Sequence, residues 1–285
     1  MISRRRLISL AAGSAFVSSA LYISLRRMDV WRLFTRQPSG KRQRPKWVDC
    51  GPTPLAERRY TPQGMTWRGD ELVIAVSLNY RPSMVFRISR ETHAIRGSFE
   101  MPRAATHTSG LAWDGQCIWA VDFSARRCYE VDAARSFSTG VAQIVATFDT
   151  GLDGTSACCF VTFNGAQVLA ISQFRKDRQT VFVNHQEAIN DGSAQRHKVF
   201  SYRNGGFSQG LEFDGKYLYE SENRAGRSII NKIDLGLLTS TKDSFLSTVA
   251  QLDAPGWGVE DLAWDGQRLW TADEFSFRLY NSLIQ

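Results

Sequence analysis

Residues 260–273 read EDLAWDGQRLWTAD, and four other segments of the chain align with this one without gaps. Each copy has an aromatic residue at its fifth place, glycine two residues later and an aliphatic residue three further on. The other copies are QGMTWRGDELVIAV (63–76), SGLAWDGQCIWAVD (109–122), CFVTFNGAQVLAIS (159–172) and QGLEFDGKYLYESE (209–222). Successive copies start 46, 50, 50 and 51 residues apart. A period of this length indicates a protein built from one supersecondary unit per repeat.

Each copy predicts a β-hairpin. An Asp-Gly or Asn-Gly pair in four copies supplies the positive φ that a two-residue turn requires, and Arg68-Gly69 takes that place in the first. Alternating segments behind the hairpins, such as 126–132 and 142–150, predict a third and a fourth strand. Five such units predict an all-β fold, a five-bladed β-propeller of four-stranded antiparallel blades over residues 47–285. An irregular β-sandwich would not place a glycine in phase in every copy.

The last copy ends soon after its third strand, at FRLYN (277–281). An unpaired strand edge at that point would invite association with other chains. The segment KWVDC (46–50), just ahead of the first copy, is the natural partner. We therefore expect the two ends of the propeller to complete one blade together.

The basic charge of the chain is concentrated ahead of the repeats. Residues 1–46 hold eleven Lys or Arg and one acid, which leaves 24 basic and 27 acidic residues in 47–285. The motif SRRRLI (3–8) and the nineteen uncharged residues 7–25 resemble a twin-arginine export signal. We predict a signal sequence or signal anchor at 1–25 and a basic flexible linker at 26–46. The protein is therefore expected outside the cytoplasm, in the periplasm or held at the membrane by this segment alone.

The body of the chain is mildly acidic and gives no sign of a basic face, so we predict no nucleic-acid partner. We also expect a monomer, since nothing in the sequence indicates an oligomer. Its five cysteines are too few and too irregular for a disulfide scaffold or a zinc site, and buried free thiols are expected. The polar stretch 184–198 predicts an exposed loop, and 235–248 predicts a short helix between blades.

The segment GFSQG (206–210) fits the G-x-S-x-G motif of serine hydrolases. That motif needs a helix directly behind it, because the nucleophile stands at a sharp turn between a strand and a helix. The following LEFDGKYLYE (211–220) predicts a hairpin, so we interpret the match as chance.

Candidate binding residues come from the ends of the predicted strands. In a propeller, the start of the first strand and the end of the second open on the same face, around the central channel. These positions are mostly polar and predict a peptide or small-molecule ligand at the channel face. The starts are Gln63, Ser109, Cys159, Gln209 and Glu260, and the ends are Val76, Asp122, Ser172, Glu222 and Asp273.

Glu220 breaks the repeat pattern. The equivalent residues in the other copies are small or apolar: Ile74, Ala120, Ala170 and Thr271. A carboxyl group at a buried place is costly unless it is paired or its pKa shifts, which is how catalytic acids arise. Glu220 is therefore a candidate catalytic residue. The alternative is a structural glutamate paired with Arg224 or Arg227.

Residues 207–221, FSQGLEFDGKYLYES, and 225–235, AGRSIINKIDL, resemble the FTQGLEF…LYEST…GxSxLRKVDL signature of the glutamine cyclotransferase family, the plant and bacterial type of glutaminyl cyclase. The resemblance implies a five-bladed propeller that converts N-terminal glutamine to pyroglutamate with loss of ammonia. It implies Glu220 as the acid/base and Gln209 at the mouth of the active site. The motif lies in the fourth copy rather than the first, and SENRAG (221–226) replaces STGxYG.

The segment GWGVEDLAWDG (256–266) resembles the WGLT blade of the same family, although Glu260-Asp261 stands at its heart. This places Trp257 and Glu260 in the predicted substrate site, together with Gln63, Gln209 and Glu222. No segment resembles the LTW stretch that carries the family's substrate-stacking tryptophan.

Two other functions stay open. Carboxylates at Glu222, Glu260 and Asp273 are the kind of ligands that Ca²⁺ prefers, so a calcium-dependent lactonase- or lyase-like propeller is one. An exported propeller that binds a ligand or protein without catalysis is the other, since this fold serves both purposes. No cofactor is expected beyond this possible structural calcium.

Overall fold

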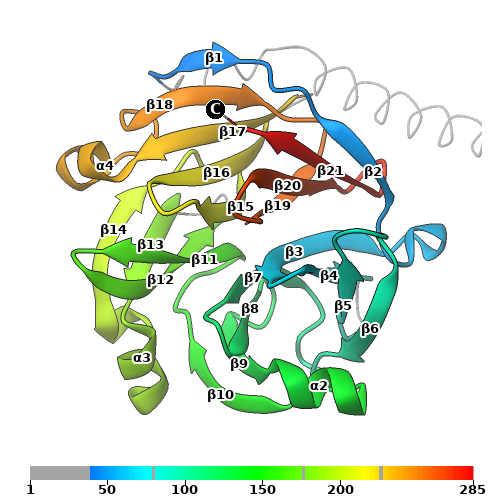
Figure 1. Cartoon of the computed structure of the whole chain (residues 1–285). Coiled ribbons are helices and arrows are strands. Elements are labelled where there is room, and N and C mark those ends of the chain that lie inside the picture. The colour runs from blue at the N-terminus through cyan, green and yellow to red at the C-terminus, as the bar shows by residue number, and fades with distance from the viewer. Residues whose placement is uncertain (1–38, 79–80, 175–176, 225–226, 285) are drawn as a thin grey trace, which may run out of the picture.

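The computed structural model describes residues 39–284 except 79–80, 175–176 and 225–226. Its five antiparallel sheets stand around a ring, with one edge of each sheet toward the centre (Figure 1). The prediction of a five-bladed propeller with four-stranded blades is confirmed. The predicted signal at 1–25 and most of the predicted linker lie outside the described residues. In the part of the chain that is described, no helix is both long and apolar enough to span a membrane.

Four blades follow one path, from the innermost strand to the outermost. The first blade consists of β3 (Thr61–Arg68), β4 (Glu71–Ser77), β5 (Met84–Ser89) and β6 (Ile95–Glu100). The second consists of β7 (Thr108–Trp113), β8 (Cys117–Asp122), β9 (Arg127–Asp132) and β10 (Ile144–Asp149). The third consists of β11 (Thr155–Phe163), β12 (Ala166–Gln173), β13 (Gln179–Val183) and β14 (Lys198–Arg203). The fourth consists of β15 (Ser208–Phe213), β16 (Tyr217–Arg224), β17 (Arg227–Asp234) and β18 (Thr248–Asp253).

The two ends of the described chain meet in the fifth blade. Its strands are β19 (Val259–Trp264), β20 (Arg268–Asp273), β21 (Arg278–Leu283) and β2 (Val48–Pro52), and β2 runs antiparallel to β21. The predicted closing strand is therefore confirmed. A further strand, β1 (Lys41–Gln43), pairs in parallel with β18 and gives the fourth blade a fifth strand, so the end of the predicted linker lies on the propeller.

Short helices join the third and fourth strands of three blades: α2 (Ala133–Thr139), α3 (His185–Asp191) and α4 (Leu235–Thr241). In each, an Asp or Asn side chain at the N-cap accepts a hydrogen bond from a main-chain amide of the first turn. The helix predicted within 235–248 is confirmed. The exposed loop predicted at 184–198 is wrong, since this segment holds α3 and a 3₁₀ turn at Gln195–His197. Another 3₁₀ turn spans Ala56–Arg58.

The inner strands approach one another closely. A β-carbon at Gly110 of β7 would lie 2.6 Å from the Cα of Ala157 on β11, and one at Gly64 would overlap Gly110 in the same way. Glycine at these places lets neighbouring backbones come into contact around the axis. Apolar side chains fill the interfaces between blades behind this ring; Trp119, Phe182 and Tyr219 are among the buried aromatic residues.

The third copy departs from the ungapped alignment. Phe163 pairs with Ala166 across its turn, whereas the equivalent Trp113 pairs with Ile118 in the second copy, so the register of the third hairpin differs by two residues. Its first strand is shifted in consequence, and Cys159 pairs with Ala170 as Leu111 pairs with Ala120. The prediction that Cys159 lies at the channel mouth is therefore wrong; its thiol is buried in the core.

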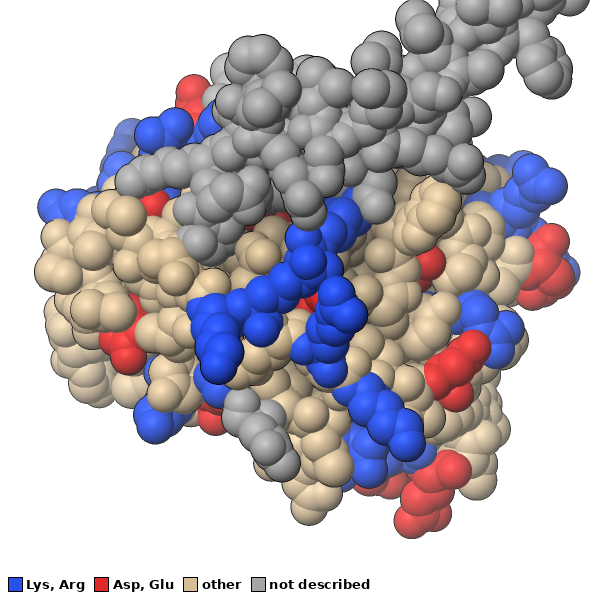
Figure 2. All heavy atoms as spheres, turned by 90° about the horizontal axis from the view of Figure 1, so that it is seen from above, with Lys and Arg blue, Asp and Glu red and all other residues tan. Residues whose placement is uncertain are grey.

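Lys and Arg side chains gather in a band on the side of the molecule seen from above (Figure 2). The tail contributes exposed side chains at Lys41, Arg42, Arg44 and Lys46. Arg42 and Arg44 lie 2.9 and 3.5 Å from Asp253 of β18. The described part of the basic tail therefore lies against the fourth blade.

Candidate functional site

The structure brings the starts of the first strands and the ends of the second strands together, because these ends pair within each blade. Ser208 pairs with Glu222, and Thr108 pairs with Asp122. In each of these blades a β-bulge follows the first pair, and the bulge turns the side chain of Gln209 or Ser109 away from the regular alternation. Such a face of irregular backbone on a rigid scaffold is where ligands bind.

Gln209 and Glu260 meet at this face. The Nε2 atom of Gln209 donates a hydrogen bond of 3.2 Å to Oε1 of Glu260, from the fourth blade to the fifth. Gln209 is partly exposed to solvent, whereas only 3% of Glu260 is exposed. Burial raises the pKa of Glu260 well above its ordinary value, and a hydrogen-bonded carboxylate neighbour, Glu274, raises it further. The carboxyl group of Glu260 can therefore hold a proton, and a single hydrogen bond links it to the partly exposed side-chain amide of Gln209.

Exposed aromatic side chains flank Glu260. Trp257 is 58% exposed and Phe275 is 53% exposed. Gly258 leaves no room for a β-carbon beside Glu274 and Phe275, so the Trp257 loop packs directly on this segment. The predicted substrate residues Gln209, Trp257 and Glu260 therefore come from the same sector of the ring, at the border of the fourth and fifth blades.

Glu220 lies between the third and fourth blades and is fully buried. Its Oε2 accepts a hydrogen bond of 3.1 Å from the hydroxyl of Tyr202, and its Oε1 accepts one of 3.3 Å from the amide of Gly205. Burial raises the pKa of Glu220 well above its ordinary value, and the charge and hydrogen bond of Glu222 raise it further. Arg227, one of the two partners considered from the sequence, instead pairs with Asp253.

Glu222 is also fully buried and completes this acid pair. Asn231 donates a hydrogen bond of 3.0 Å to its Oε1. A β-carbon at Gly205 would overlap the Glu222 carboxylate, so only glycine lets the connector 204–207 lie across it. Two carboxyl groups that share one buried site hold a proton between them, because both cannot ionise at low cost.

Gln63 and His107 form a third contact at the mouth, across the first and second blades. Oε1 of Gln63 lies 2.7 Å from Nε2 of His107, and the imidazole stacks on Phe123 at 5.0 Å between centroids. Burial lowers the pKa of His107, although the charge of Asp122 acts in the opposite direction. Gln63 thus binds a residue of the second blade, whereas Gln209 binds one of the fifth, so the two glutamines belong to different contacts.

The carboxylates of Asp122 and Asp273 accept main-chain hydrogen bonds at the strand ends. Asp122 accepts amide hydrogen bonds from His107, Ser124 and Ala125 at 2.8, 2.9 and 2.7 Å. Asp273 accepts from the amides of Gly258 and Phe275 at 3.0 and 3.2 Å. Both of these amides bind Oδ1 of Asp273, and the hydroxyl of Ser276 donates to Oδ2 at 2.9 Å, so each oxygen of this calcium-ligand candidate already accepts a hydrogen bond.

One group of potential metal ligands lies elsewhere. Within the described ranges, donor atoms of Asp114, Cys117 and Glu130 all lie within 4.8 Å of one another. Asp114 already accepts bonds from the Cys117 amide and from Trp119 Nε1 at 2.6 and 2.7 Å, and burial raises the pKa of the Cys117 thiol to about 12. Asp265 makes the same bonds to the turn and to Trp270 in the fifth blade, so this aspartate serves the hairpin.

Asp261 was missed by the sequence analysis as an individual residue. Its carboxylate accepts backbone amides from four inner strands: Met65 at 2.9 Å, Leu111 at 3.3 Å, Leu211 at 3.2 Å and Leu262 at 2.9 Å. The signal was present, because an acid stands where three other copies have glycine. Tyr202 was missed as well, because its approach to Glu220 depends on how the third and fourth blades pack.

The predicted site residues thus fall into separate groups. Glu220 and Glu222 contact the third blade, and Gln209 and Glu260 contact each other across the fourth and fifth. Glu220 and Gln209 belong to the same sheet, but their hydrogen-bond partners come from different neighbouring blades. The structure does not bring these two side chains into direct contact.

The sequence matches no family model and no curated protein. Among solved structures, the chain is similar to glutaminyl cyclase from Myxococcus xanthus, with a TM-score of 0.61 and 13% identity over 87% of this chain and 100% of that one. It is also aligned with the PQQ-bound aldose sugar dehydrogenase from Streptomyces coelicolor, with a TM-score of 0.49 and 11% identity over the same shares. The likeness to the cyclase confirms the propeller fold and leaves the activity to be argued from the site.

Proposed function

We propose that this chain is a glutaminyl-peptide cyclotransferase that uses the Glu220–Glu222 pair to move protons. The observation that carries the proposal is the pair itself: two buried carboxyl groups, one with a raised pKa, on the strand whose sequence resembles the cyclase signature. The likeness of the propeller to Myxococcus xanthus glutaminyl cyclase supports it at the level of fold.

The reaction needs a group that is a base and then an acid. The α-amine of an N-terminal glutamine attacks the carbon of its own side-chain amide, a new C–N bond closes the ring, and the old C–N bond breaks. The attacking amine must lose a proton, and the departing nitrogen must gain one before it leaves as ammonia. A pair that holds one proton provides both states at once, since one carboxyl is ionised while the other is protonated.

The hydrogen bonds from Tyr202 and Asn231 are consistent with proton transfer by the Glu220–Glu222 pair. Tyr202 donates to Glu220 and Asn231 donates to Glu222, so each carboxyl is held by a neutral donor. Burial raises the pKa of the Tyr202 hydroxyl as well, and it therefore stays a donor at neutral pH. Neutral donors fix the orientation of the acids without pulling their pKa down as strongly as an arginine would.

The substrate must reach an acid pair that has no exposed surface in this structure. The connector 204–207 covers the pair, with Gly205 against Glu222 and its amide on Glu220. We infer that this connector moves aside when the substrate binds. In this proposal Gln209, beyond the connector at the start of β15, holds the substrate's carbonyl or amine by hydrogen bonds.

The test is incubation of the purified chain with a peptide that begins with glutamine, followed by mass spectrometry for the loss of one ammonia. We expect Glu220→Gln to lower the rate by roughly a hundredfold or more, as the loss of acid/base catalysis does. Glu212→Gln is the matched control, because it neutralises another glutamate of the same blade whose oxygens bind main-chain amides. Equal rates in the two variants would contradict the role of Glu220.

A non-catalytic binding propeller is the second candidate. The observation that favours it is the complete burial of Glu220 and Glu222, since a buried acid pair can also fix the packing of two blades. In that case the wild type releases no ammonia, and Glu220→Gln changes the melting temperature instead. The two candidates therefore predict different outcomes of the same pair of measurements.

A further inference from the structure

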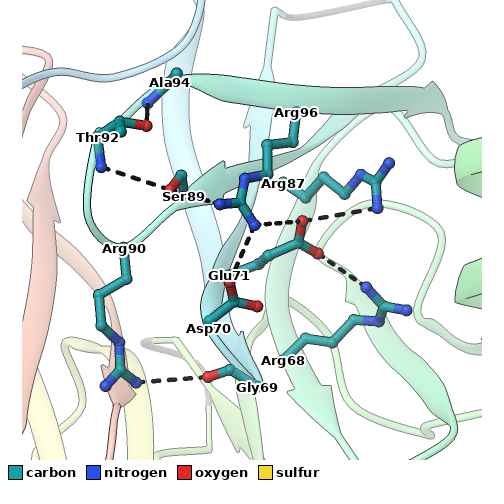
Figure 3. Close-up of polar contacts among 10 residues, drawn as sticks. All are labelled: Arg68, Gly69, Asp70, Glu71, Arg87, Ser89, Arg90, Thr92, Ala94 and Arg96. Atoms are coloured by element: carbon teal, nitrogen blue, oxygen red, sulfur yellow. Dashed lines mark hydrogen bonds and ion pairs between the residues drawn. The ribbon is translucent and has the colours of Figure 1, made fainter.

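Four arginines gather at the hairpin end of the first blade, the end of β3 and β4 that lies away from the channel mouth (Figure 3). Arg68 ends β3, Arg87 lies in β5, Arg90 follows β5, and Arg96 lies in β6. Two acids, Asp70 and Glu71, lie among them. The cluster therefore carries two positive charges in excess.

Glu71 is the internal anion of this cluster. Its side chain is 7% exposed, and its Oε2 lies 2.8 Å from Nη1 of Arg68. Its Oε1 lies 3.6 Å from Arg87 and 3.7 Å from Arg96. Arg96 also pairs with the exposed Asp70 at 3.0 Å. A single buried carboxylate thus faces three guanidinium groups and satisfies one of them at hydrogen-bond distance.

Acceptors and aromatic rings together hold the guanidinium groups in place. Arg90 donates to the carbonyls of Asp265 and Gly69 at 3.1 and 3.5 Å, and Arg96 donates to Ser89 Oγ at 3.0 Å as well as to Asp70. Arg68 lies over the ring of Trp113 at 5.5 Å, Arg87 over Phe137 at 5.2 Å, and Arg90 over Trp67 at 4.6 Å. Gly97 makes room for Arg87, because a β-carbon there would lie 2.9 Å from its Nε. Stacked guanidinium groups keep their N–H donors in the ring plane, free for oxygen acceptors.

Several donors of the cluster have no acceptor. The Nε atoms of Arg68, Arg87 and Arg90 are buried without a hydrogen-bond partner among the described residues. The guanidinium group of Arg87 donates no hydrogen bond within that part of the chain, and 32% of this side chain is exposed. The buried Nε atoms are out of reach of a ligand, but the Arg87 side chain is partly exposed. Native proteins rarely leave a preorganised charged donor unused, so an acceptor from outside the chain is the physical expectation for Arg87.

In the second blade, acidic side chains stand at the positions equivalent to two of these arginines. Arg68, Glu71 and Arg87 correspond by register to Asp114, Cys117 and Glu130. The aspartate that ties the hairpin turn in the second, fourth and fifth blades is therefore absent from the first. Arg68, Arg90 and Arg96 take over part of this structural role through Glu71, Asp265 and Asp70, whereas the Arg87 side chain has no hydrogen-bond acceptor among the described residues.

We propose that the arginine cluster of the first blade binds a dianionic oxyanion, a phosphate or sulfate group. Two negative charges match the excess charge of the cluster, and several oxygens on one centre can accept from Arg87 and Arg96 while Glu71 keeps Arg68 in place. Arginine is the side chain suited to such recognition, because its planar fork presents paired donors. The site is separate from the acid pair and does not depend on the proposed activity.

The test measures the melting temperature of the full chain, and the heat of binding, with inorganic phosphate at about pH 8, where phosphate is mostly a dianion. Sodium chloride keeps the ionic strength constant. We expect the midpoint to rise in proportion to the logarithm of phosphate concentration. Arg87→Gln should weaken binding at least about tenfold, as the loss of a charge-assisted contact does. Arg103→Gln, which removes an exposed arginine outside the cluster, should leave binding unchanged.

Glu71→Gln provides the opposite prediction, since removing the competing anion should tighten phosphate binding about threefold or more. Equal effects of chloride and phosphate, or equal binding by Arg87→Gln and Arg103→Gln, would overturn the site. Glycerol 3-phosphate distinguishes the source. Tighter binding than inorganic phosphate identifies a phosphate ester as the ligand, and weaker binding identifies the free ion.

Discussion

Asp261 joins four blades through one carboxylate. Each of its oxygens accepts two main-chain amides, from Met65 and Leu111 on one oxygen and from Leu211 and Leu262 on the other. Burial raises the pKa of Asp261, and the four amide donors act against that rise. The amides would otherwise have no acceptor at the crowded axis, so this side chain completes the hydrogen bonding of the inner strands.

Asp261→Asn should destabilise the protein by roughly 2–6 kcal/mol. The amide group keeps one oxygen and turns an NH₂ group toward the two remaining main-chain donors, and each buried donor left unsatisfied costs about 1–3 kcal/mol. Denaturant unfolding measures the change. Asp265→Asn, the same substitution at a solvent-facing turn, is the control and should cost about 1 kcal/mol. Similar losses in both variants would show that the axial carboxylate has no special role.

Glu212 makes stability depend on pH. It is partly buried, and its oxygens accept from the amides of Phe213 and Trp264 at 2.8 and 2.9 Å, the latter across to the fifth blade. Burial raises its pKa from 4.5 to about 7. The folded state therefore holds a proton that the unfolded state has released, and the stability from this group is full below pH 4.5 and is lost as pH rises to about 7.

Glu212→Gln removes that titration. The fall in unfolding free energy from about pH 4.5 to about pH 7 should be smaller than in the wild type by about 1–3 kcal/mol, since one pKa unit is worth about 1.4 kcal/mol. Denaturant titrations at several pH values measure it. Glu91→Gln, at an exposed position, should follow the wild-type curve. If the Glu212→Gln curve also runs parallel to the wild type, the glutamate does not titrate in this range.

At the scale of single elements, the hairpins were predictable because their signals are local. Paired strands and turn glycines follow from alternation and positive φ, as at Gly115 and Gly215. The third copy shows where a local pattern fails. Its glycine, Gly165, keeps the phase, but the pairing of its two strands is shifted by two residues, and the register of a strand cannot be seen from one strand alone.

The helix α3 was predictable and was missed. Asn184 and Glu187 stand three residues apart, the spacing of a capping box, and the Asn184 side chain accepts from the Glu187 amide in the structure. The polar composition of 184–198 suggested a loop because so short a helix buries few side chains, His185 and Ala188 in this case. Capping residues are the better signal for helices of this length.

The strands β1 and β2 should differ in importance. Deleting residues 1–44 removes β1, which adds three exposed residues to the edge of the fourth blade, and should cost about 1–2 kcal/mol and leave a folded monomer. Deleting residues 1–55 also removes β2 and leaves β21 without its partner, so aggregation is expected. Size-exclusion chromatography and thermal unfolding compare the two. Equal behaviour of the two deletions would mean that β2 does not close the ring.

At the scale of the whole molecule, the number of blades and the closure of the ring could be predicted from the repeat. Which of the predicted site residues contact one another could not. Glu220 was found because it departs from four equivalent residues. Its neighbours Tyr202 and Gly205 come from the preceding blade, and only the packing of blades decides which sheet face meets which. For the same reason, the contact of Gln209 with Glu260 of the next blade could not be seen in the sequence.

The closure of the ring also sets an order of events. Asp49 of β2 and Arg278 of β21 are 229 positions apart, and their side chains lie 2.6 Å from each other. Strand β2 is synthesised ahead of the first blade and finds its partner only when β21, the last strand, has been made, and until then the growing chain carries an open edge. Such long-range pairing slows folding, because the entropy of closing the loop is lost before the contacts form. A nascent chain of this protein should depend on protection from association until its final strand has emerged.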